Sequence, residues 1–159
     1  MATRTKPTTL AMGRLLVIED DLAVRHILRV VLEEAGHEVL DADDGSRGLA
    51  IAQRRSPGVI VLDVMMPFTD GFAVLEALRE DDRTASIPVL MLSAMQHEPV
   101  EEQCYRLGAK AYIRKPFDQG ILLGTIEELL SAPPELAAEI ERPVREVPLA
   151  VTLAWRDGA

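Results

Sequence analysis

The chain has 159 residues and a formal net charge of −9, and 48% of its residues are apolar. This length suits a single domain, and the apolar content is sufficient for a true core, which argues against disorder. The negative charge disfavours general binding to the phosphate backbone of nucleic acids. A single cysteine, Cys104, excludes a disulfide framework and a cysteine-based zinc cluster.

No apolar run reaches the roughly 18 residues that a membrane span requires. The first segment, residues 1–13, is polar and lacks the apolar centre of a signal peptide. We therefore expect a soluble, cytoplasmic protein.

Short apolar runs and helical patterns alternate between residues 14 and 131. The runs that predict strands are 15–18, 39–40, 59–62, 88–92 and 111–113. The patterns that predict helices are 22–35, 45–55, 71–80, 99–107 and a stretch from Asp118 to about Leu130. Gly36 and Gly108 stand where helices are expected to end, and Asp70 stands where one begins. Five such repeats predict a mostly parallel sheet with helices on both faces.

Polar side chains follow four of the five predicted strands. They are Glu19 and Asp20 after the first strand, Asp63 after the third, Ser93 after the fourth and Lys115 after the fifth. In an open α/β sheet, ligands bind at the carboxyl ends of the strands. We therefore expect these side chains to gather at one edge of the sheet, although they lie far apart in the sequence.

The expected cluster has a definite chemistry. Crowded carboxylates repel one another and raise each other's pKa values, and a divalent hard cation such as Mg²⁺ removes this conflict. A lysine ammonium and a serine hydroxyl suit the oxygens of a phosphoryl group. An aspartate can itself be the nucleophile and form an aspartyl phosphate. The set therefore favours phosphoryl transfer, which needs mainly positioning and charge neutralisation.

The segment from about Arg14 to Leu130 resembles a response-regulator receiver domain of two-component signalling. The resemblance covers about three quarters of the chain and rests on motifs that occur in the family's order and at its spacing. These motifs are LVIEDD (residues 16–21), VLDVMMP (61–67), DG (70–71), MLSA (91–94) and GAKAYIRKPF (108–117). The resemblance implies a flavodoxin-like fold with a five-stranded parallel sheet.

The resemblance also assigns a role to each matching residue. Asp63 corresponds to the phosphoacceptor and Asp20 to the direct Mg²⁺ ligand, with Glu19 in the neighbouring acidic position that usually acts through water. Asp63 and the backbone carbonyl of Met65 complete the protein's share of the metal shell. Asp21 then begins the first helix as its cap.

Three further positions match the family's motif. Ser93 corresponds to the hydroxyl that hydrogen-bonds the phosphoryl group, and Lys115 to the lysine that pairs with it. Tyr112 corresponds to an aromatic residue that switches between outward and inward rotamers. The resemblance implies a cis peptide bond between Lys115 and Pro116.

The implied function is a phosphorylation-dependent signalling switch and not a metabolic enzyme. A sensor histidine kinase or a phosphotransfer protein would donate the phosphoryl group to Asp63 with Mg²⁺ bound, and a downstream protein would respond. The sequence leaves open the identity of these partners and the oligomeric state, including a homodimer.

Three alternatives have discriminating features. A receiver fold that acts as a constitutive interaction module would lose an acid, the hydroxyl or the lysine, and all are present. A phosphohydrolase with an aspartate nucleophile usually has a second aspartate two residues later, where Met65 stands. A flavin-binding protein of the same fold needs a phosphate loop rich in Ser, Thr and Gly after the first strand, where acids stand instead.

The expected organisation is an N-terminal extension (1–13), the receiver domain (14–131) and a C-terminal tail (132–159). The tail is too short for a DNA-binding output domain. Residues 135–142 show a short helical pattern, and the alternating apolar residues from Val147 to Trp155 suit a half-buried strand. The alternative is a poorly ordered terminus. His26, His37 and His97 are expected on the surface, and Cys104 in a helix, buried or half-buried, without a redox role.

Overall fold

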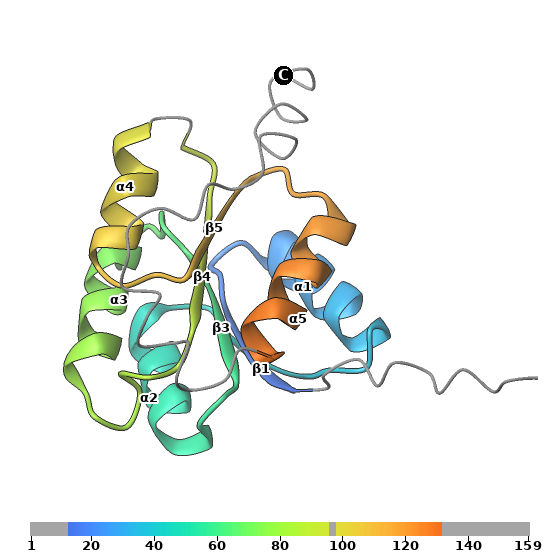
Figure 1. The fold of residues 1–159 in the computed structure, drawn as a ribbon, viewed down its shortest axis with the longest axis horizontal. Helices are drawn as coiled ribbons and strands as arrows, with labels where there is room; N and C mark the ends of the chain where they lie inside the picture. Colours follow the sequence, from blue (N-terminus) through green and yellow to red (C-terminus); the bar gives the residue numbers. More distant parts are fainter. Residues whose placement is uncertain (1–12, 96–97, 132–159) are drawn as a thin grey trace, which may run out of the picture.

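The computed structural model describes residues 13–95 and 98–131. In this part of the chain, five strands and five helices alternate (Figure 1). The strands are β1 (Arg14–Ile18), β2 (Glu38–Ala42), β3 (Val59–Asp63), β4 (Val89–Ser93) and β5 (Ala111–Arg114). The helices are α1 (Leu22–Glu34), α2 (Gly45–Arg55), α3 (Gly71–Glu80), α4 (Glu98–Arg106) and α5 (Gln119–Ser131). Residues 1–12, His97 and the tail, for which the sequence predicts a helix and a strand, lie outside the described residues.

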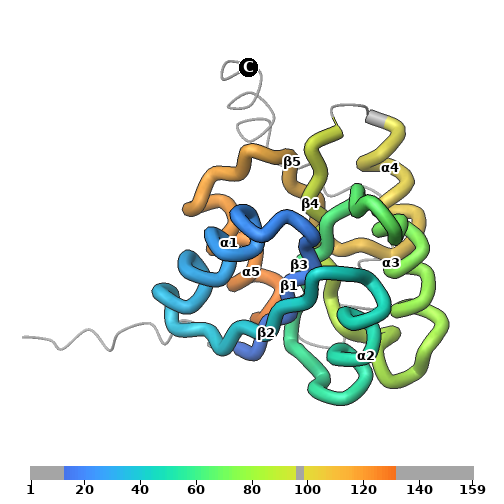
Figure 2. The backbone as a smooth tube through the Cα atoms, turned by 180° about the vertical axis from the view of Figure 1, so that it is seen from behind, coloured from blue at the N-terminus to red at the C-terminus, as the bar shows by residue number. Residues whose placement is uncertain are grey.

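The five strands form one parallel sheet in the order β2-β1-β3-β4-β5. Helices α1 and α5 cover one face of the sheet, and α2, α3 and α4 cover the other (Figures 1 and 2). The chain leaves β1 toward β2 and then crosses back to β3, so the direction of winding reverses between the carboxyl ends of β1 and β3. This topology confirms the predicted flavodoxin-like fold and creates the crevice in which such sheets bind ligands.

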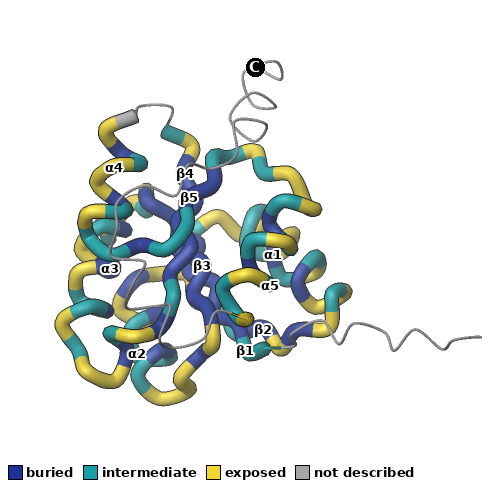
Figure 3. The backbone as a smooth tube through the Cα atoms, in the orientation of Figure 1, coloured by how far each residue is buried: buried dark blue, intermediate teal, exposed yellow. Residues whose placement is uncertain are grey.

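Strands β1, β3 and β4 are mainly apolar and buried, as is typical of parallel strands covered on both faces, and Figure 3 shows the centre of the sheet as buried. Successive side chains of a strand point to opposite faces. Leu16, Ile18, Ile60 and Leu62 therefore pack in the core under α2, α3 and α4. Their neighbours Leu15, Val17, Val59 and Val61 pack in a second core under α1 and α5.

Helix ends follow the predicted capping residues. The side chain of Asp21 accepts a hydrogen bond from the backbone N–H of Val24 at 3.0 Å, and Asp70 accepts one from Phe72 at 2.9 Å. Gly36 and Gly108 have positive φ angles of 95° and 100°, which glycine adopts without strain at the ends of helices. No helix in the described part of the chain is long and apolar enough to cross a membrane.

Two sequence predictions differ from the structure. Strand β2 is longer than predicted because it pairs with the whole of β1, from Arg14 opposite Glu38 to Ile18 opposite Ala42. His37 is buried, with 6% of its surface exposed, so its placement on the surface was wrong. The turn before β2 packs against the start of β1, and the backbone N–H of Gly13 donates to His37 Nδ1 at 3.2 Å. Cys104 is buried, as predicted.

Candidate functional site

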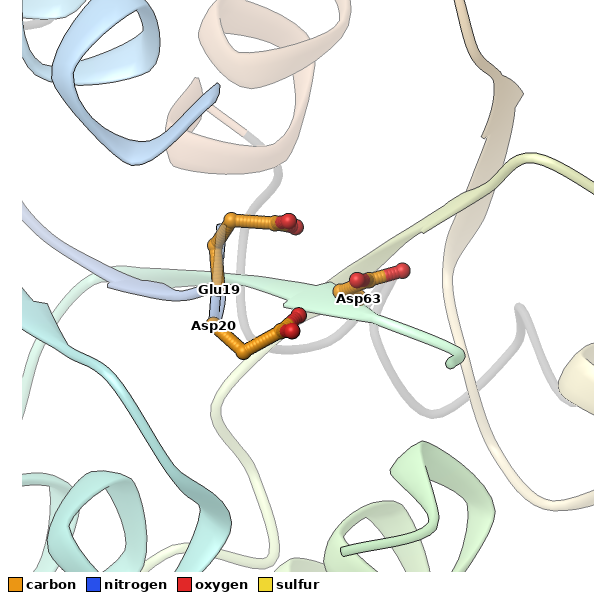
Figure 4. Close-up of side chains that lie close together, drawn as sticks. All are labelled: Glu19, Asp20 and Asp63. Carbon is orange, nitrogen blue, oxygen red and sulfur yellow. The ribbon is translucent and has the colours of Figure 1, made fainter. Parts of the chain in front are cut away.

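Three carboxylates meet at the carboxyl edge of the sheet. Glu19 and Asp20 follow β1, and Asp63 ends the neighbouring strand β3. One oxygen of each lies within 4.8 Å of the others, and Figure 4 shows the three side chains converging. Glu19 is 1% and Asp63 is 4% exposed, whereas Asp20 is half-buried. The adjacent Asp21 instead caps α1, as the sequence predicts.

Lys115 reaches this acidic group from the end of β5. Its Nζ lies 3.0 Å from Glu19 Oε2 and 3.3 Å from Asp63 Oδ2. Its backbone N–H donates to the carbonyl of Ser93 at 2.8 Å, which holds the segment after β5 against β4. The Lys115–Pro116 peptide bond is cis, as the resemblance implies.

The electrostatics of the group follow from burial and crowding. Burial raises the pKa of Glu19 to about 7, with Lys115 opposing this shift and Asp63 adding to it. Burial also raises the pKa of Asp63, against the pull of the Lys115 cation. Burial alone would lower the pKa of Lys115, but its bonds to the two carboxylates raise it. Lys115 is therefore the cation that stabilises the charged forms of two carboxylates whose burial opposes ionisation.

The donor chemistry of this cluster fits Mg²⁺. The side chains of Glu19, Asp20 and Asp63 offer only oxygen ligands, which hard divalent cations prefer. A bound cation would also reduce the repulsion between these crowded carboxylates. Within residues 13–95 and 98–131, they form the group of acidic, histidine and cysteine side chains that is close enough to hold a metal ion.

Ser93 and Tyr112 lie on adjacent strands and both contact Met95. Ser93 is buried at the end of β4, and its Oγ accepts a hydrogen bond from the backbone N–H of Met95 at 2.9 Å. Tyr112 in β5 is 5% exposed, and its hydroxyl donates to the carbonyl of Met95 at 3.2 Å. The tyrosine ring therefore points inward, and the segment after β4 links the two side chains.

Met65 lies in the loop after β3. Its backbone N–H donates to Asp63 Oδ1 at 3.2 Å, so the loop turns back over the carboxylate. Its side chain is exposed. The role of its backbone carbonyl as a metal ligand stays a prediction.

Two features beside the acids escaped the sequence analysis. Arg25 Nη1 donates to the backbone carbonyl of Glu19, so α1 directly contacts the acidic loop, residues 19–21 between β1 and α1. A cavity of about 510 Å³ also opens beside Lys115, lined by apolar residues of α1 and of the segment after β5. The helical spacing of Arg25 from the cap Asp21 was a usable signal for the first feature, but it did not reveal which atoms the guanidinium contacts.

The sequence matches the family described as the response regulator receiver domain over residues 15–127. The chain belongs to the response-regulator receiver family. The Protein PilH of Pseudomonas aeruginosa is 35% identical over 120 residues, which cover 76% of this chain and 99% of PilH. Receivers are phosphoacceptor signalling modules of two-component systems, and they bind Mg²⁺ at an acidic pocket.

Similar receiver domains occur in proteins of different length. The "DNA-binding dual master transcriptional regulator RpaA" of Synechocystis is 44% identical over 119 residues, which cover 75% of this chain and 49% of RpaA. The chain thus spans about half the length of that relative. The solved structure of the chemotaxis protein CheY4 of Vibrio cholerae matches with a TM-score of 0.71 and 33% identity, over 75% of this chain and 99% of CheY4.

Proposed function

We propose that this receiver accepts a phosphoryl group on Asp63 from a phosphohistidine, with Mg²⁺ bound, and then changes its binding to a downstream protein. The donor is a sensor histidine kinase or a phosphotransfer protein. The observation that carries the proposal is the cluster of Glu19, Asp20 and Asp63 at the carboxyl edge of the sheet, with Lys115 paired to two of these acids.

Each residue of the cluster has a part in holding the metal. Asp20 and Asp63 are the proposed direct ligands, Glu19 stands beside them, and the backbone carbonyl of Met65 completes the protein's share. Bound Mg²⁺ would offset the charge of these carboxylates and of the phosphoryl oxygens that approach them.

In the transfer step, a carboxylate oxygen of Asp63 forms a bond to phosphorus while the bond from phosphorus to the donor's imidazole nitrogen breaks. The electron pair of the broken bond stays on that nitrogen, so no oxidant or reductant is needed. Lys115 Nζ, 3.3 Å from Asp63 Oδ2, is placed to pair with a phosphoryl oxygen. The Ser93 hydroxyl is the proposed hydrogen-bond donor to another.

The same contacts suggest how the signal leaves the site. If the Ser93 hydroxyl turns toward a phosphoryl group, it gives up the hydrogen bond from Met95 N–H. Tyr112 bonds the carbonyl of the same Met95, so its side chain responds to the new position of this segment. The face between α4 and β5 would then change its shape for a protein partner.

The test is incubation of the full chain with acetyl phosphate and Mg²⁺, followed by intact mass measurement. We expect the wild type to gain the mass of one phosphoryl group, and Asp63→Asn and Asp20→Asn to gain none. Asp43→Asn, which removes an exposed acid near α2, is the matched control and should label like the wild type. Labelling of Asp63→Asn, or none of the wild type, would contradict the proposal.

A constitutive interaction module is the competing function. To distinguish the two functions, amide NMR spectra of the protein are compared before and after phosphorylation. We expect the signals of Ser93, Met95 and Tyr112 to shift. A protein that accepts the phosphoryl group without any change at these positions would act as a constitutive module.

A further inference from the structure

We infer that Arg25 is a positioning residue for the metal-binding acids: it holds the backbone of Glu19 and Asp20 so that their carboxylates face Asp63. This inference deepens the proposed function and rests on it, because Mg²⁺ is the ligand concerned. Arg25 lies on α1, one turn after the cap residue Asp21, and its side chain is only 15% exposed.

The contacts of Arg25 are with the backbone of the acidic loop. Its Nη1 lies 2.9 Å from the carbonyl oxygen of Glu19 and 3.4 Å from that of Asp20. On the other side, the backbone N–H of Glu19 donates to the carbonyl of Ala42 at 3.1 Å. The peptide groups before and after Glu19 are therefore held from two directions, which leaves the carboxylates free to converge on Asp63 (Figure 4).

Asp41 of β2 holds the guanidinium in place. Arg25 Nε lies 3.3 Å from Asp41 Oδ2, and the other carboxylate oxygen accepts from Arg29 Nη1 at 2.9 Å. Arg29 also pairs with Glu33 at 2.8 Å on the exposed side of α1. Arg29 thus shares Asp41 with Arg25, and its guanidinium bonds the carboxylates of Asp41 and Glu33. This makes Arg29 a matched control of equal charge.

The charge of Arg25 and its position act in opposite directions on a bound cation. A nearby positive charge repels Mg²⁺, so loss of the charge alone would strengthen Mg²⁺ binding. Loss of the hydrogen bonds to the carbonyls would loosen the loop and weaken Mg²⁺ binding, as loss of outer-shell contacts generally does. The sign of the change in affinity therefore distinguishes the two effects.

A lysine at this position keeps the charge but not the geometry. The planar guanidinium presents several donors at fixed angles and can bond Asp41 and the Glu19 carbonyl together, whereas an ammonium is a single flexible point of charge. Arg25→Lys should therefore restore only part of what Arg25→Met loses.

The experiment measures Mg²⁺ binding to the full chain by calorimetry, without a phosphodonor. We expect Arg25→Met to raise the Kd for Mg²⁺ about tenfold and Arg25→Lys to lie between it and the wild type. Arg29→Met should bind as tightly as the wild type or more tightly. In the metal-free protein, hydrogen exchange at the Glu19 amide should be faster in Arg25→Met than in Arg29→Met. The two variants are compared under conditions in which urea unfolding gives them the same free energy of unfolding.

The outcomes separate the inference from the proposed function. If the wild type binds Mg²⁺ and Arg25→Met binds it equally well or more tightly, the inference is overturned. If the wild type shows no saturable Mg²⁺ binding, the proposed function itself is contradicted, and the inference that rests on it is contradicted with it. If Arg25→Met does not fold, Arg25→Lys carries the test, and a wild-type Kd and exchange rate in that variant would overturn the inference.

Discussion

Glu19 is an acid whose environment opposes its charge in the metal-free protein. Burial raises its pKa from 4.5 to about 7. Between pH 4.5 and about pH 7, Glu19 therefore holds a proton in the folded state that it has released in the unfolded state. By linkage, the free energy of unfolding contributed by this group is highest below pH 4.5 and falls as the pH rises to about 7.

Replacement of Glu19 by the neutral Gln tests this sign. In metal-free protein at about pH 8, we expect Glu19→Gln to unfold with a free energy at least about 1 kcal/mol higher than the wild type. Near pH 5 the difference should shrink, because wild-type Glu19 is then protonated. Urea unfolding at both pH values measures this. Glu76→Gln on the exposed side of α3 is the control, and an advantage of Glu19→Gln that is independent of pH would contradict the prediction.

Gly71 begins α3 next to the backbone of Asp63, the proposed phosphoacceptor. A Cβ at this position would collide with the backbone carbonyl of Asp63 and would lie 2.7 Å from Val64 Cα. Both neighbours are backbone atoms at the end of a central strand, so relief requires a shift of Asp63 itself. The glycine therefore fits its place by size, and its N–H donates to the carbonyl of Val64 at 3.0 Å.

We expect Gly71→Ala to destabilise the protein by about 1–3 kcal/mol, as overpacking does, and to reduce labelling of Asp63 by acetyl phosphate. Thermal unfolding and mass measurement follow the two effects. Gly124→Ala in α5 is the matched control, because a Cβ there meets no atom within 4 Å. It should be neutral or stabilising, since alanine favours a helix over glycine. Equal stability of the two variants would show that the strand end yields easily.

At the scale of the elements, Arg79 joins α3 to the two segments that follow it. Its guanidinium donates to the carbonyls of Ala85 and Ile87 at 2.9 and 2.8 Å, and to that of Gly108 at 3.0 Å. Burial lowers the pKa of Arg79. One side chain of α3 thus bonds both the segment before β4 and the turn after α4.

Removal of this guanidinium leaves three partly buried carbonyls without their donor. We expect Arg79→Met to lower the free energy of unfolding by about 2–3 kcal/mol. Arg83→Met, which breaks an exposed pair with Asp81 at 2.7 Å, should cost much less than Arg79→Met, because water screens the pair. Urea unfolding of both variants gives the comparison. Equal losses would mean that water replaces the guanidinium of Arg79.

At the scale of the whole molecule, Mg²⁺ binding and folding are linked. A ligand that binds only the folded state stabilises it, by about 2.7 kcal/mol when its concentration is a hundred times its Kd. We expect saturating Mg²⁺ to raise the unfolding temperature of the wild type and of Asp43→Asn, but not that of Asp20→Asn. The shift should weaken below about pH 7, where protons compete for Glu19. Equal stabilisation of all three proteins would place the ion elsewhere.

The fold was largely predictable because its signals are local. Capping aspartates such as Asp21 and Asp70, and the glycines that end helices, marked helix boundaries to within a residue or two. Strand β2 was harder to predict, since Asp41 and Glu38 break its apolar pattern. As an edge strand it tolerates polar residues, and its length is set by pairing with β1.

The membership of the site was also predictable, because each parallel strand delivers the residue at its carboxyl end to the same edge. The carboxyl ends of β1 and β5 therefore lie at the same edge, although Glu19 and Lys115 are 96 positions apart in the chain. The supporting contacts were not predictable. Arg25, Arg79 and His37 each bond backbone atoms, and a backbone partner cannot be recognised from residue types in the amino-acid sequence.

The amino-acid sequence thus carried the alternation of strands and helices, the acidic character of the site and the residues that gather there, since these depend on periodicity and residue type. The three-dimensional arrangement was needed for the pairing of Lys115 with two acids, the inward position of Tyr112 and the hold of Arg25 on the acidic loop. These are contacts between distant segments, and their distances and burial arise only when the sheet and its two helical layers pack together.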